Sequence, residues 1–151
     1  NRNFFIKNLN SDIQKKIIFR LHQAYTRRFP NEAEIVRNEL KNIKIDEGRI
    51  HIKHLMKQSK LVIYTYYSTG FLELISFDTP ILCLEEDLLK KVRKKYKKIF
   101  LEMIDNKIIF TNFDDLTTFF SKEYLTIDEW WKSSKISNLR SKFYNIFCKK
   151  T

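Results

Sequence analysis

Short apolar runs alternate with amphipathic segments along the whole chain. The clearest example is residues 60–84, KLVIYTYYSTGFLELISFDTPILCL. After Lys60, this part has four consecutive apolar residues, then a small polar turn, then apolar residues at helical spacing, and it ends in a second apolar run. Uninterrupted apolar runs are typical of strands buried on both faces of a parallel sheet. The pattern therefore predicts a strand, a turn, a helix and a second strand.

The same alternation continues on both sides of this part. Further strands are predicted at residues 16–21, 43–46 and 108–110, and helices at residues 31–40, 51–58, 87–104, 114–120 and from 126 to about 149. Strands that alternate with helices indicate an α/β fold, here a Rossmann-like parallel sheet with right-handed crossovers and helices on both faces. Because no linker rich in Pro or Gly interrupts the pattern, residues 1–151 are predicted to form a single domain.

The polar turn at Ser68, Thr69 and Gly70 follows a buried strand and opens a helix. The first N–H groups of a helix have no acceptor within it, and this favours an anion at that end. In open parallel sheets, ligands bind at the carboxyl ends of the strands. We therefore expect this turn to hold the phosphates of a nucleotide-type donor. An ordinary capped helix is the alternative.

Three more polar residues are candidates for the same chemistry. Glu73 can accept hydrogen bonds from both hydroxyls of a ribose, or it can cap its own helix. Arg20 ends a predicted strand, and its planar fork matches two phosphate oxygens. The alternative for Arg20 is a surface arginine paired with a carboxylate. His22 suits a phosphate donor or an acid, and the alternative is an imidazole that is simply packed.

Composition narrows the class of partner. The formal net charge of +11 favours an anion, which can be a phosphorylated substrate, a nucleic acid or an acidic membrane. The predicted helix at residues 87–104 is basic and amphipathic, which fits either a membrane surface or a solvated outer face. Interleaved aromatic and basic residues of a nucleic-acid platform are missing, so nucleic acid is not expected as a partner.

Other motifs add little. Cys83 and Cys148 do not make a disulfide framework, and reduced thiols in the cytosol are expected. The sequence contains neither GxGxxG, GxxxxGKS, G-x-S-x-G nor Asp-x-Asp, and no metal or other cofactor is expected. No apolar run approaches the ~20 residues that cross a bilayer. Since the first residue is Asn, we expect the chain to be a fragment that lacks an N-terminal domain.

The motifs together resemble a known family. Residues 61–84 are similar to the donor-binding segment of GT-B-fold glycosyltransferases, and more closely to a family of bacterial surface-carbohydrate biosynthesis transferases. That family combines a strand ending in Arg, an Asn-Ser-Thr turn with a following Glu, an (Asn/Asp)-x-Pro turn and a Trp-Trp helix followed by Arg and Phe. The matching residues here are Arg20, Ser68 and Thr69, Glu73, Asp78-Thr79-Pro80, Trp130-Trp131, Arg140 and Phe143. Tyr67 stands where the family has Asn.

The resemblance implies the C-terminal, nucleotide-sugar-binding half of a two-domain glycosyltransferase. Ser68, Thr69 and Gly70 would present amides or hydroxyls to the diphosphate, with Tyr67 and His22 as further substrate contacts. Glu73 would bind the ribose, and Arg20 would be catalytic by neutralising the leaving phosphate. The nucleotide-sugar is then a substrate and not a cofactor. The expected partners are this donor, the missing N-terminal domain and, peripherally, an anionic membrane at the inner face of the cell membrane.

Two other classes of function remain open. A polyol-phosphate transferase of the CDP-glycerol type, or a domain like that of a nucleotide-sugar epimerase, would keep the sheet and change the chemistry. A basic module that binds membrane or nucleic acid without catalysis is the non-enzyme alternative. A transferase predicts that Glu73→Ala and Arg20→Ala are the damaging changes. The non-enzyme module predicts that charge reversal on Lys90 to Lys98 abolishes function, whereas Glu73→Ala leaves it intact.

Overall fold

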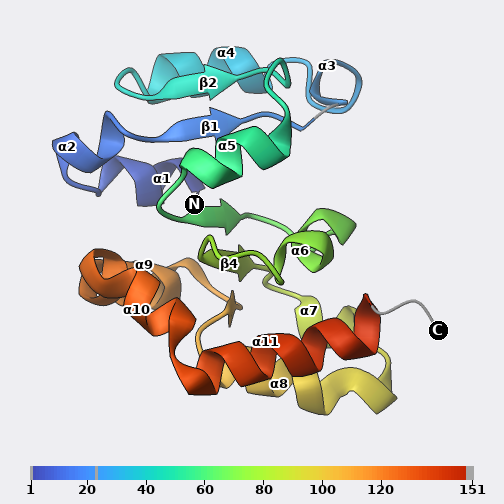
Figure 1. Cartoon of the computed structure of the whole chain (residues 1–151). Helices are drawn as coiled ribbons and strands as arrows, with labels where there is room; N and C mark the ends of the chain where they lie inside the picture. Colours follow the sequence, from blue (N-terminus) through green and yellow to red (C-terminus); the bar gives the residue numbers. More distant parts are fainter. Residues whose placement is uncertain (1, 23, 149–151) are drawn as a thin grey trace. The chain divides into compact units, whose positions relative to one another are not determined.

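The computed structural model describes residues 2–22 and 24–148, which Figure 1 draws as a chain of short helices and strands. The chain divides into two compact units, Asn1–Leu55 (unit 1) and Met56–Thr151 (unit 2), and each is described by itself. The predicted end of the last helix near Lys149 lies outside the described residues. The prediction that residues 1–151 form a single domain depends on how these two units are joined, so it stays a prediction.

Unit 1 contains a two-stranded parallel sheet. β1 (Ile18–Arg20) pairs with β2 (Lys44–Asp46), and Arg20 stands opposite Asp46. The guanidinium of Arg2 lies over the ring of Phe19 on β1 and also donates to Glu32 at 3.0 Å, so the first helix is linked both to the sheet and to the fourth helix. The helices of this unit are α1 (Arg2–Lys7), α2 (Ser11–Gln14), α3 (Tyr25–Arg28), α4 (Glu32–Glu39) and the first part of α5 (Ile52–Gln58).

Unit 2 contains a three-stranded parallel sheet in the order β3 (Val62–Tyr64), β4 (Ile81–Leu84), β5 (Ile109–Phe110). Every residue of the central strand β4 is buried, as its continuous apolar run predicts. The helices of this unit after α5 are α6 (Thr69–Leu74), α7 (Leu88–Lys91), α8 (Lys97–Asp105), α9 (Phe113–Glu123), α10 (Ile127–Lys132) and α11 (Ser134–Phe147). Two 3₁₀ helices, η1 (Lys94–Tyr96) and η2 (Tyr124–Thr126), precede α8 and α10.

An aromatic cluster joins three of these helices in the core of unit 2. Phe71 of α6 is fully buried and contacts Phe143 of α11, with 6.3 Å between ring centroids. Phe100 of α8 contacts both Phe143, at 5.3 Å, and Phe147, at 5.5 Å. Edge-to-face ring pairs add to the hydrophobic contribution of burial. These ring contacts therefore hold α6, α8 and α11 together.

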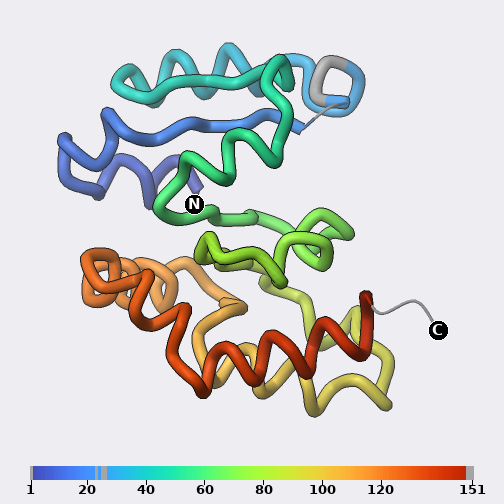
Figure 2. The backbone as a smooth tube through the Cα atoms, viewed as in Figure 1, coloured from blue at the N-terminus to red at the C-terminus, as the bar shows by residue number. Residues whose placement is uncertain are grey.

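The structure differs from the sequence predictions in two respects. The α/β class and the parallel pairing are confirmed, but the strands pair as two short sheets, one within each unit, where a single sheet was predicted. The long helix predicted at residues 87–104 is wrong. Val92 and Arg93 are extended, with ψ of 131° and 141°, so the backbone turns between α7 and α8 (Figure 2). Among the described residues, no helix is long and apolar enough to span a membrane.

Candidate functional site

The turn between β3 and α6, here called the β3–α6 corner, carries the residues predicted to bind a donor. Ser68 is the N-cap, in extended conformation, but its side chain makes no capping hydrogen bond. Its carbonyl oxygen accepts the N–H of Phe71 at 3.1 Å. The N–H groups of Thr69 and Gly70 donate to no described residue. Two adjacent backbone donors at the carboxyl end of a parallel strand therefore remain available to a ligand.

Gly70 allows two hydroxyl groups to lie close to the start of α6. A Cβ atom at this position would lie 3.1 Å from the hydroxyl oxygen of Tyr64 and 3.5 Å from the hydroxyl oxygen of Ser68. A side chain here would therefore have to displace the Tyr64 hydroxyl. Because residue 70 has no side chain, the hydroxyls of Tyr64 and Ser68 can lie close to the backbone at the start of α6.

The ring of Tyr67 packs against other aromatic side chains. Its ring contacts Phe71, with 5.8 Å between centroids, and Phe100, at 5.4 Å. Burial, with the nearby cysteines adding to it, raises the pKa of the Tyr67 hydroxyl well above its ordinary value, so the hydroxyl stays protonated. Tyr67 thus extends the aromatic cluster to the corner. Its predicted contact with substrate stays a prediction.

Glu85 is a residue at this corner that the sequence patterns did not single out. It directly follows β4, and its Oε2 accepts the N–H of Tyr67 at 3.0 Å. Its Oε1 accepts a hydrogen bond from the Lys91 ammonium at 2.6 Å. Partial burial opposes ionisation of Glu85, but the bonds from Lys91 and Tyr67 outweigh it and hold the pKa of Glu85 below its ordinary value. A carboxylate directly after a buried strand was the signal available in the sequence.

Glu73 lies exposed on α6, five residues after its N-cap. No described N–H donates to its carboxylate, so the alternative in which Glu73 caps its own helix is not what the structure shows. Burial raises the pKa of the Cys148 thiol, and the charge of Glu73 adds to this shift. Cys148 itself donates to the carbonyl oxygen of Leu72 at 3.2 Å. Glu73 therefore presents an unpaired carboxylate beside the end of α11.

Arg20 and His22 belong to unit 1, and the structure describes them apart from the β3–α6 corner. Arg20 forms an ion pair through Nη1 with Asp46, which is 5% exposed, and the same nitrogen donates to the Ile50 carbonyl at 2.6 Å. Arg20 is therefore paired with a carboxylate through Nη1, as the alternative interpretation of this residue expects. His22 accepts the N–H of Ala24 on Nδ1 at 3.0 Å. Their predicted contacts with a donor stay predictions.

The family motif near the C-terminus holds the far end of α6. Trp131 is fully buried, and its indole N–H donates to the Phe77 carbonyl at 3.0 Å. Arg140 donates to the carbonyls of Ile75 at 2.9 Å, Phe77 at 2.7 Å and Trp131 at 3.2 Å. Its guanidinium lies 3.9 Å from the centroid of the Trp131 ring. These contacts secure the chain between α6 and β4.

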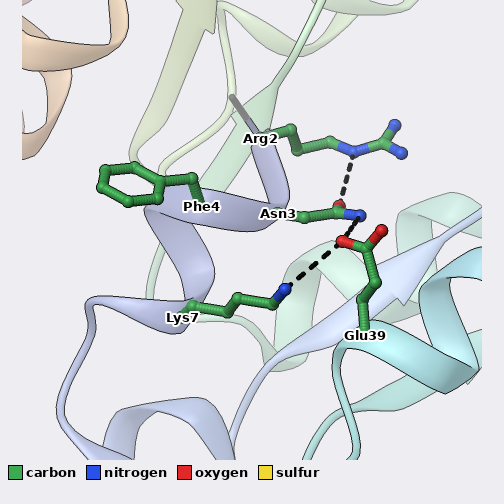
Figure 3. Close-up of a pocket in the computed structure, with 5 residues that line it drawn as sticks. All are labelled: Arg2, Asn3, Phe4, Lys7 and Glu39. Carbon is green, nitrogen blue, oxygen red and sulfur yellow. Dashed lines mark hydrogen bonds and ion pairs between the residues drawn. The ribbon is translucent and has the colours of Figure 1, made fainter.

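Figure 3 shows a separate polar hollow on unit 1, between α1 and α4. Glu39 accepts hydrogen bonds from Asn3 at 2.9 Å and Lys7 at 3.5 Å, while the ring of Phe4 points away from them. The Asn3 bond, with Lys7 adding to it, lowers the pKa of Glu39. The polar side chains that line this hollow therefore form hydrogen bonds and ion pairs with one another. The described residues contain no group of three or more His, Cys, Asp or Glu side chains placed to hold a metal ion.

A protein-family model described as "LIC12162 family transferase" matches residues 1–151, the whole length of the chain. No curated protein and no solved structure gives a significant match. The match agrees with the transferase class that the sequence motifs implied.

Proposed function

The chain belongs to the LIC12162 family of transferases, and from this premise we propose that unit 2 binds the nucleotide-sugar donor of a glycosyltransferase for bacterial surface carbohydrates. The family match over the whole chain is the observation that carries the proposal. The parallel α/β sheet of unit 2 and the open amides at the β3–α6 corner support it, because nucleotides bind at such strand ends.

The chemistry at the corner follows from its donors and acceptors. Diphosphate oxygens accept hydrogen bonds from the N–H groups of Thr69 and Gly70 and from the hydroxyls of Ser68 and Thr69. Because α6 has only six residues, these direct bonds contribute more than the helix dipole does. The exposed carboxylate of Glu73 accepts the ribose hydroxyls. Donors fixed around the departing phosphate stabilise negative charge as the sugar is transferred.

Glu85 supports this site without touching the donor. Its bond to the Tyr67 N–H holds the residue before Ser68, and its ion pair with Lys91 fixes the carboxylate. The corner is thus tied to the end of β4 before a ligand arrives. Such preorganisation lowers the free-energy cost of ordering the turn on binding.

Calorimetric titration of the full-length gene product with UDP, GDP, CDP, CMP and CDP-glycerol tests the proposal. We expect one nucleoside diphosphate to bind, and we expect Glu73→Ala to weaken it about tenfold, which corresponds to about 1.4 kcal/mol. The control is Glu129→Ala, an exposed glutamate of α10, which should leave the affinity unchanged. Equal affinities for Glu73→Ala and wild type, or no binding of any nucleotide, would overturn the proposal. Preference for CDP-glycerol would move it to polyol-phosphate transfer.

Arg20 is tested separately, because its Nη1 is already engaged by Asp46. The role proposed for it is neutralisation of the leaving phosphate. Arg20→Lys keeps a positive charge for Asp46, and Arg49→Lys is the control because the Arg49 side chain is 86% exposed. We expect only Arg20→Lys to reduce sugar transfer while circular dichroism stays unchanged. Equal transfer by the two variants would remove Arg20 from the proposal.

A further inference from the structure

Residues 90–98, here called the basic segment, carry seven Lys or Arg side chains in nine positions. The segment spans the end of α7, the extended residues Val92 and Arg93, η1 and the start of α8. All seven cations are exposed: Lys90, Lys91, Arg93, Lys94, Lys95, Lys97 and Lys98. No other stretch of the sequence has this density of positive charge.

Packing on one side keeps these cations on the outer surface of unit 2. Leu88 before the segment and Ile99 and Phe100 after it are buried, and each is at least 96% covered. The ring of Tyr96, within the segment, lies 5.0 Å from that of Phe147. The apolar residues thus fasten the segment to the core at both ends and at its middle, and the charged side chains extend into solvent.

Nearby carboxylates neutralise only the first two cations. Lys90 pairs with Asp87 at 2.7 Å, and Lys91 pairs with Glu85 at 2.6 Å. The remaining five, from Arg93 to Lys98, make no ion pair with a described carboxylate. A cluster of uncompensated surface cations attracts an anionic partner over a distance of about a Debye length, roughly 10 Å at 0.1 M salt.

We propose that the basic segment docks unit 2 on an anionic lipid surface. A lipid surface offers diffuse negative charge and needs no matching shape, which fits flexible lysines on a short, bent segment. Single-stranded nucleic acid would require exposed aromatic rings for base stacking, whereas Tyr96 is packed against Phe147. This inference goes beyond the proposed donor site and does not depend on it.

The test is co-sedimentation of the full-length gene product with vesicles of phosphatidylcholine, with and without phosphatidylglycerol. Each cation near such a surface contributes about fivefold to binding. We therefore expect Lys94→Glu, Lys95→Glu and Lys98→Glu together to lower binding to the anionic vesicles at least ~100-fold. Glutamates near the start of α8 suit its helix dipole, so the fold should persist, and tryptophan fluorescence checks it.

The matched control is the triple variant Lys41→Glu, Lys44→Glu and Lys53→Glu, which changes the net charge equally at other exposed positions. We expect a reduction several-fold smaller than in the segment variant. Equal losses in the two variants would overturn the proposal, because net charge alone would then explain binding. Equal binding to vesicles without phosphatidylglycerol would also overturn it. Tighter binding to a DNA oligonucleotide, lost in the segment variant, would replace lipid by nucleic acid.

Discussion

Replacing Arg140 by alanine should destabilise unit 2 more than any change of an exposed cation. Arg140 donates three hydrogen bonds to backbone carbonyls, and two of their residues, Ile75 and Trp131, are fully buried. Hydrogen bonds from a charged group contribute about 1.5–3 kcal/mol each, and the cation–π contact contributes about 0.5–2 kcal/mol. These terms are not additive, and burial costs the guanidinium part of its hydration, which lowers its pKa.

We therefore expect Arg140→Ala to lose about 3 kcal/mol of unfolding free energy, out of the ~5–15 kcal/mol typical of a domain. Urea unfolding followed by fluorescence measures this loss, because both tryptophans of the chain, Trp130 and Trp131, lie in unit 2. Far-UV circular dichroism should give the same midpoint. Arg140→Lys keeps the charge but not the planar fork, and it should lose about half as much.

The control for this prediction is Lys135→Ala, an exposed lysine on the same helix, which should change stability by less than ~0.5 kcal/mol. If Arg140→Ala matched this control, the carbonyl contacts would contribute nothing to stability, and the account of how α6 is held would be refuted.

Two further predictions concern the β3–α6 corner. Gly70→Ala should change stability by less than ~1 kcal/mol, because the gain in helix propensity offsets the contact with the Tyr64 hydroxyl. It should nevertheless weaken nucleotide binding about tenfold, and wild-type affinity in the same titration would contradict this. Glu85→Gln should be less stable than wild type at neutral pH. Since the folded-state pKa of Glu85 is lowered, this difference should shrink as pH falls below the ordinary value of 4.5, and a constant difference in urea unfolding would refute it.

Strand positions and the site turn were predictable because their signals are local. Apolar runs marked β1, β3, β4 and β5 to within a few residues, and the alternating residues 43–46 marked β2. The helix α6 begins at the Ser68-Thr69-Gly70 turn, with Ser68 as its N-cap, and Glu73 lies on it, as the sequence predicted. Periodicity and capping depend on neighbours within about one helical turn, so the sequence expresses them directly.

The break in the predicted long helix shows where local signals fail. Leu88, Val92 and Tyr96 continue one apolar stripe at helical spacing, which predicts a single helix. The same stretch places like charges four residues apart at Lys90 and Lys94 and at Lys91 and Lys95, and such pairs destabilise a helix by about 0.2–0.5 kcal/mol each. Leu88 and Phe100 are buried in the core of unit 2 on either side of these like charges. The backbone between them, where the helix is least stable, is extended at Val92 and Arg93.

The sequence by itself determined the α/β class, the parallel strands, the polar turn at Ser68 and a surplus of positive charge. Only the tertiary structure showed that Glu85 accepts the N–H of Tyr67, that Arg140 donates to three backbone carbonyls, and that Asp46 forms an ion pair with Arg20. These partners lie 9 to 65 residues apart in the chain. Hydrogen bonds over such separations depend on how strands and helices pack together, and no period or short motif in a sequence records that packing.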